Sequence, residues 1–194
     1  MTALALPAPA PARAGPLALW NRMRDDEPLF AATALFLALT IVPLAAAGMI
    51  DPRLHLGENI WVKPIKFAIA LSVYTATLAL FARYLPAGMT RHTAYRLFAG
   101  AVVFAIAAEM VWIGGAAAMG TASHFNVDEP FWAALYPVMG AMATLLTSAS
   151  AVYAVAIARN RDLTIAPALK AGLVWGLGLT LPLTLVTAGT MSSL

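Results

Sequence analysis

Five long apolar segments constrain the fold of this chain more than any other feature. A membrane-spanning helix needs about 20 mostly apolar residues, because each residue advances about 1.5 Å across a hydrocarbon core about 30 Å thick. Five windows of the 194-residue chain meet this requirement: residues 29–50, 60–81, 97–119, 131–158 and 169–191. We therefore predict an all-α fold, a polytopic transmembrane bundle of about five helices.

The composition agrees with a bilayer environment. Hydrophobic residues make up 61% of the chain and charged residues 11%, whereas a soluble domain has about half and about a quarter. A soluble fold of this length could not bury so much apolar surface. No basic run is dense enough to bind a phosphate backbone, so the lipid bilayer is the predicted partner and nucleic acid is not. The chain has no cysteine, which excludes disulfides and thiol catalysis.

The domain organisation follows from the same windows. Residues 1–24 are rich in alanine and proline at their start, a composition typical of a disordered tail. Residues 25–194 hold all five windows and are predicted to form a single transmembrane domain.

The positions of lysine and arginine predict an orientation. Nine of them lie before the first window or after the second and fourth, whereas three lie after the first window or at the start of the second. Because cytoplasmic connections carry the excess of basic residues, the N-terminus is predicted to be cytoplasmic and the C-terminus to lie on the outer side of the membrane.

Two polar segments then fall on the same outer face, around residues 51–67 and 123–129. If the second helix includes Asn59, then Asn59, Lys63 and Lys66 share one face of it, since residues four and seven apart lie together. A polar stripe entering the membrane normally faces the bundle interior. The alternative interpretation is an interfacial anchor, with both lysines extending to the headgroups beside Trp61.

Glu109 lies near the middle of the third window. A charged group at that depth costs roughly 2.5–3.5 kcal/mol on insertion scales. Lys66 is the predicted partner, because it lies on the neighbouring helix and enters from the same side. Glu109 is interpreted either as a proton- or ligand-binding carboxylate or as a structural residue, in an ion pair or as a protonated acid bonded to a backbone carbonyl.

Histidines and glycines give weaker signals. His55, Glu58 and His124 could form a metal site, but interfacial histidines that bond loop backbone are the simpler interpretation, and no metal or other cofactor is predicted. Haem ligation between spans is not indicated, since the apolar windows contain no histidine pair. Gly172 and Gly176 form a GxxxG pattern, for which packing within the bundle is favoured over a homodimer seam.

The segment Gly57–Phe67, GENIWVKPIKF, followed by Glu109 and by Ser123–Asn126, SHFN, resembles a family of bacterial multi-pass membrane proteins that has no assigned activity. The resemblance covers residues 51–194 and implies an architecture, a polar site and a location in a bacterial inner membrane, where the C-terminus would be periplasmic. Family members often have Gln and Arg where this chain has Ala116 and Met119. They also tend to continue into further spans that contain more histidines.

Three functional hypotheses follow. The first is a membrane protein that binds or transports a small ligand or a proton. Its predicted ligand-binding residues are Glu58, Asn59, Lys63, Lys66, Glu109, His124 and Asn126. The second is an accessory subunit of a larger membrane complex or a homo-oligomer. The third is a redox protein whose site is completed by another chain or by a missing C-terminal part. No catalytic residue is predicted in this chain.

Overall fold

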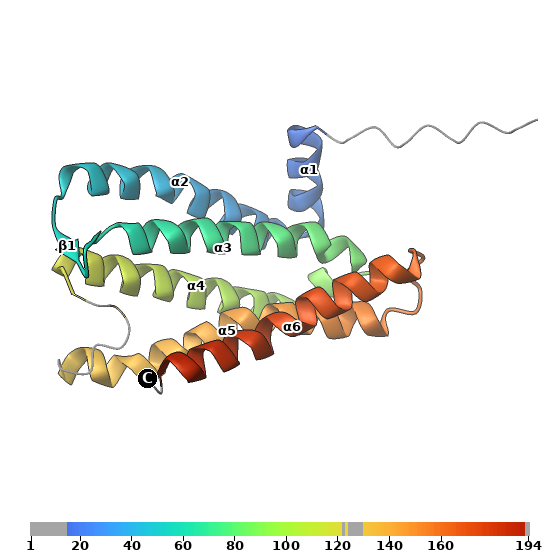
Figure 1. Cartoon of the computed structure of the whole chain (residues 1–194). Helices are drawn as coiled ribbons and strands as arrows, with labels where there is room; N and C mark the ends of the chain where they lie inside the picture. Colours follow the sequence, from blue (N-terminus) through green and yellow to red (C-terminus); the bar gives the residue numbers. More distant parts are fainter. Residues whose placement is uncertain (1–14, 122, 124–129, 193–194) are drawn as a thin grey trace, which may run out of the picture.

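The computed structural model describes residues 15–121, 123 and 130–192. Over these residues the chain is a bundle of α-helices, shown in Figure 1. The bounds of the helices are Pro16–Asp26 (α1), Pro28–Ile50 (α2), Val62–Phe81 (α3), Thr93–Met119 (α4), Pro130–Arg159 (α5) and Pro167–Ser192 (α6). Two short 3-10 helices, Ala82–Tyr84 (η1) and Met89–Arg91 (η2), connect α3 to α4.

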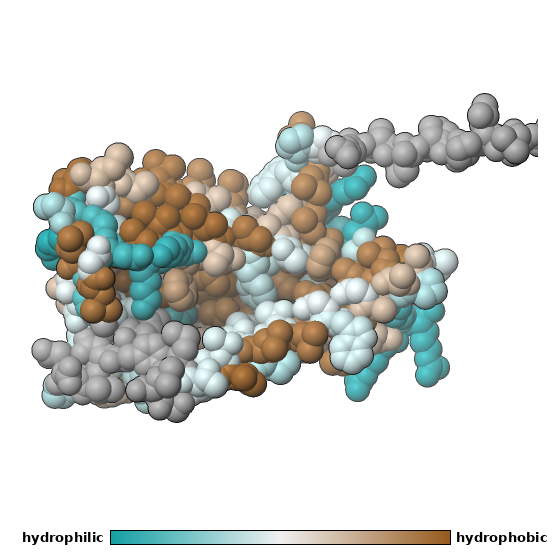
Figure 2. Space-filling model, in the orientation of Figure 1, coloured by the Kyte–Doolittle hydropathy of each residue, from teal (hydrophilic) through white to brown (hydrophobic). Residues whose placement is uncertain are grey.

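Helices α2 to α6 confirm the predicted all-α fold with five spans. In the described part of the chain, five helices are long and apolar enough to cross a membrane. Large apolar side chains cover their outer surfaces, including Phe36, Val42, Val111 and Trp175, which are each more than 60% exposed. Figure 2 shows this apolar surface along α2. Such exposure would be costly in water, and a lipid environment removes the cost.

The five spans pack in sequence, α2 on α3, α3 on α4, α4 on α5 and α5 on α6. Fully buried side chains of four helices form the core, among them Phe30 of α2, Leu78 of α3, Ile106 of α4 and Tyr153 of α5. The last helix, α6, rests mainly on α5 and contributes Leu173 and Leu177 to the core.

Part of the predicted N-terminal tail is helical. Residues 1–24 were expected to be disordered, but Pro16–Asp26 form α1, which packs against α2, α3 and η1. Pro16 suits the first turn of a helix because that turn needs no donor from its nitrogen. Met23, which is 8% exposed, anchors α1 to the core.

A small hairpin between α2 and α3 was not predicted. Strands Leu54–His55 (β1) and Glu58–Asn59 (β2) pair antiparallel, with Leu54 opposite Asn59 and His55 opposite Glu58. Leu56 and Gly57 form the turn, with φ of 52° and 83°. Two-residue hairpins favour positive φ at both turn positions. The strands are too short for an alternating sequence pattern to reveal them.

Candidate functional site

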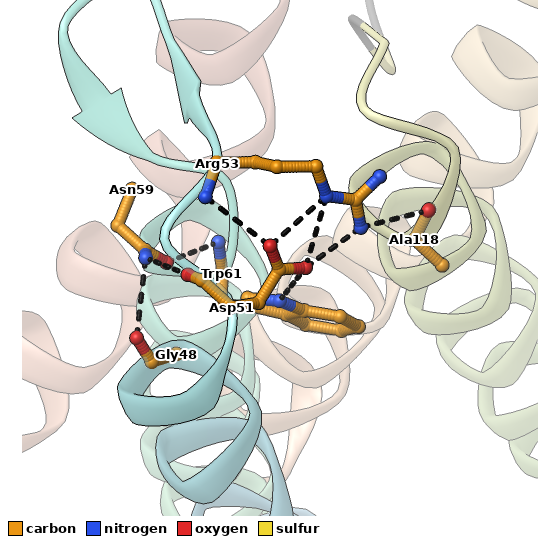
Figure 3. Close-up of polar contacts among 6 residues, drawn as sticks. All are labelled: Gly48, Asp51, Arg53, Asn59, Trp61 and Ala118. Atoms are coloured by element: carbon orange, nitrogen blue, oxygen red, sulfur yellow. Dashed lines mark hydrogen bonds and ion pairs between the residues drawn. The ribbon is translucent and has the colours of Figure 1, made fainter.

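The side chains of Asp51, Arg53, Asn59 and Trp61 lie together beside the hairpin, at the end of the bundle that was predicted to face outward. Figure 3 shows their polar contacts. Asn59 joins α2 to α3 here. Its Nδ2 donates to the carbonyls of Gly48 at 3.2 Å and Asp51 at 2.7 Å, and its Oδ1 accepts from the backbone N–H of Trp61 at 2.9 Å. Both amide hydrogens are used, so what remains for a ligand is a lone pair of Oδ1.

The spacing predicted that Asn59 shares one face of a helix with Lys63 and Lys66. This prediction is wrong. It lies in β2, and α3 begins only at Val62. The helical periodicity that aligned the three residues does not extend back to Asn59.

Asp51 and Arg53 form the centre of this network. The Arg53 Nε donates to Asp51 Oδ1 at 2.9 Å, and its Nη2 donates to Oδ2 at 2.7 Å. The indole Nε1 of Trp61 donates to the same carboxylate at 3.1 Å. Hydrogen bonding with Arg53 is the main reason that the pKa of Asp51 lies well below its usual range, and Asp51 in turn raises the pKa of Arg53.

Arg53 also ties the hairpin to a third helix. Its Nη2 donates to the carbonyl of Ala118 at 3.1 Å, in the last turn of α4. The final carbonyls of a helix have no partner within the helix, so this bond satisfies one of them. Asp51 and Arg53 were not among the site residues predicted from the sequence. The signal that could have identified them is an acidic and a basic residue two positions apart, directly after an apolar span.

Lys66 was predicted to pair with Glu109, but in the structure it lies beside Glu58. Its Nζ lies 3.4 Å from Glu58 Oε2, and both side chains are 66% exposed. An ion pair this exposed contributes little to stability, at most about 1 kcal/mol.

Glu109 interacts electrostatically with Lys63 instead. Glu109 is only 2% exposed and lies on α4, ten residues before its end at Met119. At about 1.5 Å per residue, that places it about 15 Å from the end of the helix. Lys63 lies in the first turn of α3 and belongs to the exposed residues. A carboxylate deep in the bundle therefore interacts electrostatically with a cation at the end of the bundle.

An aromatic pair joins α4 to α5 about one helical turn beyond Glu109. Trp112, one turn further along α4, packs against Trp132 of α5 with ring centroids 4.4 Å apart. Its Nε1 donates to the carbonyl of Ser123 at 2.6 Å. This bond draws the start of the connection between α4 and α5 toward Trp112.

Two predicted site residues, His124 and Asn126, lie outside the described residues. His55, considered with them for a metal site, is half-buried in β1. Within the described ranges, no three His, Asp or Glu side chains are grouped closely enough to hold a metal ion.

A second polar cluster, which the sequence analysis missed, lies at the opposite end of the bundle. Glu27, at the joint of α1 and α2, is 3% exposed and contacts Tyr95 of α4. The hydroxyls of Tyr95 and Tyr153 of α5 are 2.7 Å apart, and Tyr153 is fully buried. Burial raises the pKa of Glu27, and contacts with the Tyr95 hydroxyl and with nearby backbone N–H groups partly oppose this rise. The sequence showed Glu27 only as the boundary of a span.

A groove of about 400 Å³ separates α3 from α6. Tyr74 and Leu78 lie on its α3 side, and Gly172, Gly176 and Thr180 lie on its α6 side. The predicted GxxxG pair thus lines this groove.

The fold and the site define a multi-pass helical membrane protein with a buried carboxylate. Comparison with known proteins adds nothing to this class, since no family model, curated protein or solved structure matches the chain.

Proposed function

We propose that this protein binds a proton or a small ligand at Glu109, and that Lys63 forms the entrance to the site. The observation that carries this proposal is the burial of Glu109, 2% exposed in the middle of a membrane span. Ionisable residues inside membrane segments are costly, and they mark proton and ion pathways more often than ordinary packing positions.

The pairing with Lys63 supports access from one side. Lys63 lies at the start of α3 and is exposed, so a proton or an anion that arrives at this end of the bundle meets its ammonium group before the carboxylate. A change in the charge of either partner changes the field at the other, because the effective dielectric constant is low there.

The site belongs, in this proposal, to a bacterial inner-membrane protein with a cytoplasmic N-terminus. The support is the excess of lysine and arginine at the end of the bundle that holds α1, η1 and η2. Glu109 and Lys63 would then open to the periplasm.

Replacement of Glu109 by Gln tests the function. The protein is reconstituted in vesicles with a trapped pH indicator, and proton entry is driven by a potassium diffusion potential. We expect Glu109→Gln to keep its helical content and lose proton entry, and its infrared spectrum to lose a carboxyl band that titrates in the unsubstituted protein.

The matched control is Glu58→Gln, which removes a carboxylate at the same end of the bundle but from the exposed pair with Lys66. It should retain proton entry and the titrating band. If Glu109→Gln folds and conducts normally with an unchanged carboxyl spectrum, Glu109 does not carry the function. If it only loses stability, Glu109 and Lys63 form a structural pair.

A second candidate function is that of a subunit in a larger membrane complex. The groove between α3 and α6 favours it, because glycine pairs let helices approach closely. Purification in a mild detergent tests it directly. A monomer without a co-purifying protein, across several detergents, would contradict this role.

A further inference from the structure

Helix α1 runs across the direction of the spans, as Figure 1 shows. It is joined to α2 through the single residue Glu27, and the first span begins at Pro28. Since α2 enters the membrane at that point, so short a joint keeps the adjoining end of α1 at the level of the membrane surface. A helix that lies across the spans at that level runs along the surface.

The side chains of α1 have an apolar side. At about 100° per residue, Leu17, Leu19, Trp20 and Met23 lie on one half of the helix circumference, with Arg24 between Trp20 and Leu17. Met23 is buried and Trp20 packs against the core, so part of this half is attached to the bundle. Leu17 and Leu19 are 73% and 39% exposed. A helix in the interfacial plane buries such residues among the headgroups, and tryptophan is enriched at the same depth.

Basic residues gather at the same end of the bundle. They come from α1, from the connection between α3 and α4, from the start of α4, from the end of α5, from the connection between α5 and α6 and from the start of α6. The eight residues are Arg22, Arg24, Arg83, Arg91, Arg96, Arg159, Arg161 and Lys170. Four acids accompany them there: Asp25, Asp26, Glu27 and Asp162.

This excess of positive charge complements an anionic membrane surface, which attracts basic segments close to it. The charges of α1 itself are balanced, since Arg22 and Arg24 stand beside Asp25 and Asp26. The attraction therefore comes from the whole end of the bundle, with α1 as the part that extends over the lipid.

We propose that α1 is an interfacial helix, which inserts Leu17 among the headgroups while the surrounding basic residues bind anionic phospholipids. This proposal concerns the end of the bundle opposite to Lys63 and does not depend on the function of Glu109. The partner is a lipid surface, not a second protein.

The absence of cysteine from the sequence makes the test direct, because one introduced cysteine carries one label. The full chain is labelled at Leu17→Cys with a fluorophore and placed in lipid nanodiscs. The matched control is Ala18→Cys, which is also exposed but lies about 100° around the helix, on the side of Arg22 and Asp25. Discs of phosphatidylcholine alone are compared with discs that also contain phosphatidylglycerol.

We expect a lipid-bound quencher to quench the label at Leu17→Cys several-fold more than that at Ala18→Cys, and aqueous iodide to show the reverse order. Phosphatidylglycerol should strengthen lipid quenching at Leu17→Cys, and the added substitutions Arg22→Gln and Arg24→Gln should reduce that gain. Equal quenching of the two labels by iodide would overturn the insertion of α1. Energy transfer between labelled copies would overturn it in favour of a second copy. No response to phosphatidylglycerol would overturn the binding of anionic lipids.

Discussion

A substitution of Asn59 tests whether the hydrogen bonds of the hairpin stabilise the fold. Asn59→Ala removes three hydrogen bonds, two donated to the carbonyls of Gly48 and Asp51 and one accepted from the backbone of Trp61. A hydrogen bond contributes about 0.5–1.5 kcal/mol to stability, and a partly buried group left without a partner costs more than an exposed one. Asn59 is half-buried, and we expect the substitution to destabilise the protein by about 2–3 kcal/mol.

The assay is equilibrium unfolding in detergent micelles, titrated with a denaturing surfactant and followed by circular dichroism. A loss of 2–3 kcal/mol corresponds to an unfolding constant raised by about 30- to 150-fold. Asn59→Asp can still accept from the N–H of Trp61 but lacks both donors, and its charge would face the two carbonyl oxygens. It should therefore lose at least as much stability as Asn59→Ala.

Glu58→Ala is the control, because Glu58 precedes Asn59 in β2 and takes part only in an exposed ion pair among the contacts described. Its loss should stay below about 1 kcal/mol. If Asn59→Ala unfolds at the same denaturant concentration as the unsubstituted protein, the hydrogen bonds are not important for stability. Asn59 would then remain a candidate ligand-binding residue, as the sequence predicted.

Three further predictions concern the turn and the two buried or paired acids. Leu56→Asn should raise stability by about 1 kcal/mol in the same assay, since Leu56 has a φ of 52° that asparagine tolerates better, and an unchanged midpoint would contradict this. The folded-state pKa of Glu27 is raised above 4.5, so the contribution of Glu27 to stability should be greatest below pH 4.5 and fall as pH rises through the raised pKa. Glu27→Gln should remove that decline in melting temperature, and a decline that persists would exclude Glu27 as its source. The folded-state pKa of Asp51 is lowered from 3.8, so its contribution should be present above pH 3.8 and be lost as pH falls through the lowered pKa. Arg53→Gln should weaken this acid loss, and an identical acid profile would contradict the pairing.

The site shows where reasoning from the sequence reaches its limit. Glu109 was identifiable because a lone carboxylate stands out in an apolar window, and its burial is confirmed. Its partner was not identifiable. Lys63 and Lys66 are three residues apart in α3, and the choice between them depends on how that helix is rotated against α4. Helix rotation is set by packing, which local spacing does not encode.

The two polar clusters at the ends of the bundle could not be predicted from the sequence for a related reason. The bond from Arg53 to Ala118 joins residues 65 apart, and the contact of Tyr95 with Tyr153 joins residues 58 apart. Each residue looks ordinary in its own segment. The clusters exist only because the antiparallel path of the spans brings helix ends together.

The class of protein and its spans follow from the amino-acid sequence. Apolar runs of this length can satisfy their backbone hydrogen bonds in lipid as helices, so the runs fixed the number and limits of α2 to α6 to within four residues. The tertiary structure alone decided the hairpin, the helical state of residues 16–24, the partner of Glu109 and the cluster around Glu27. These features depend on contacts between helices, whereas the spans depend on contact with lipid, which each segment makes independently of the others.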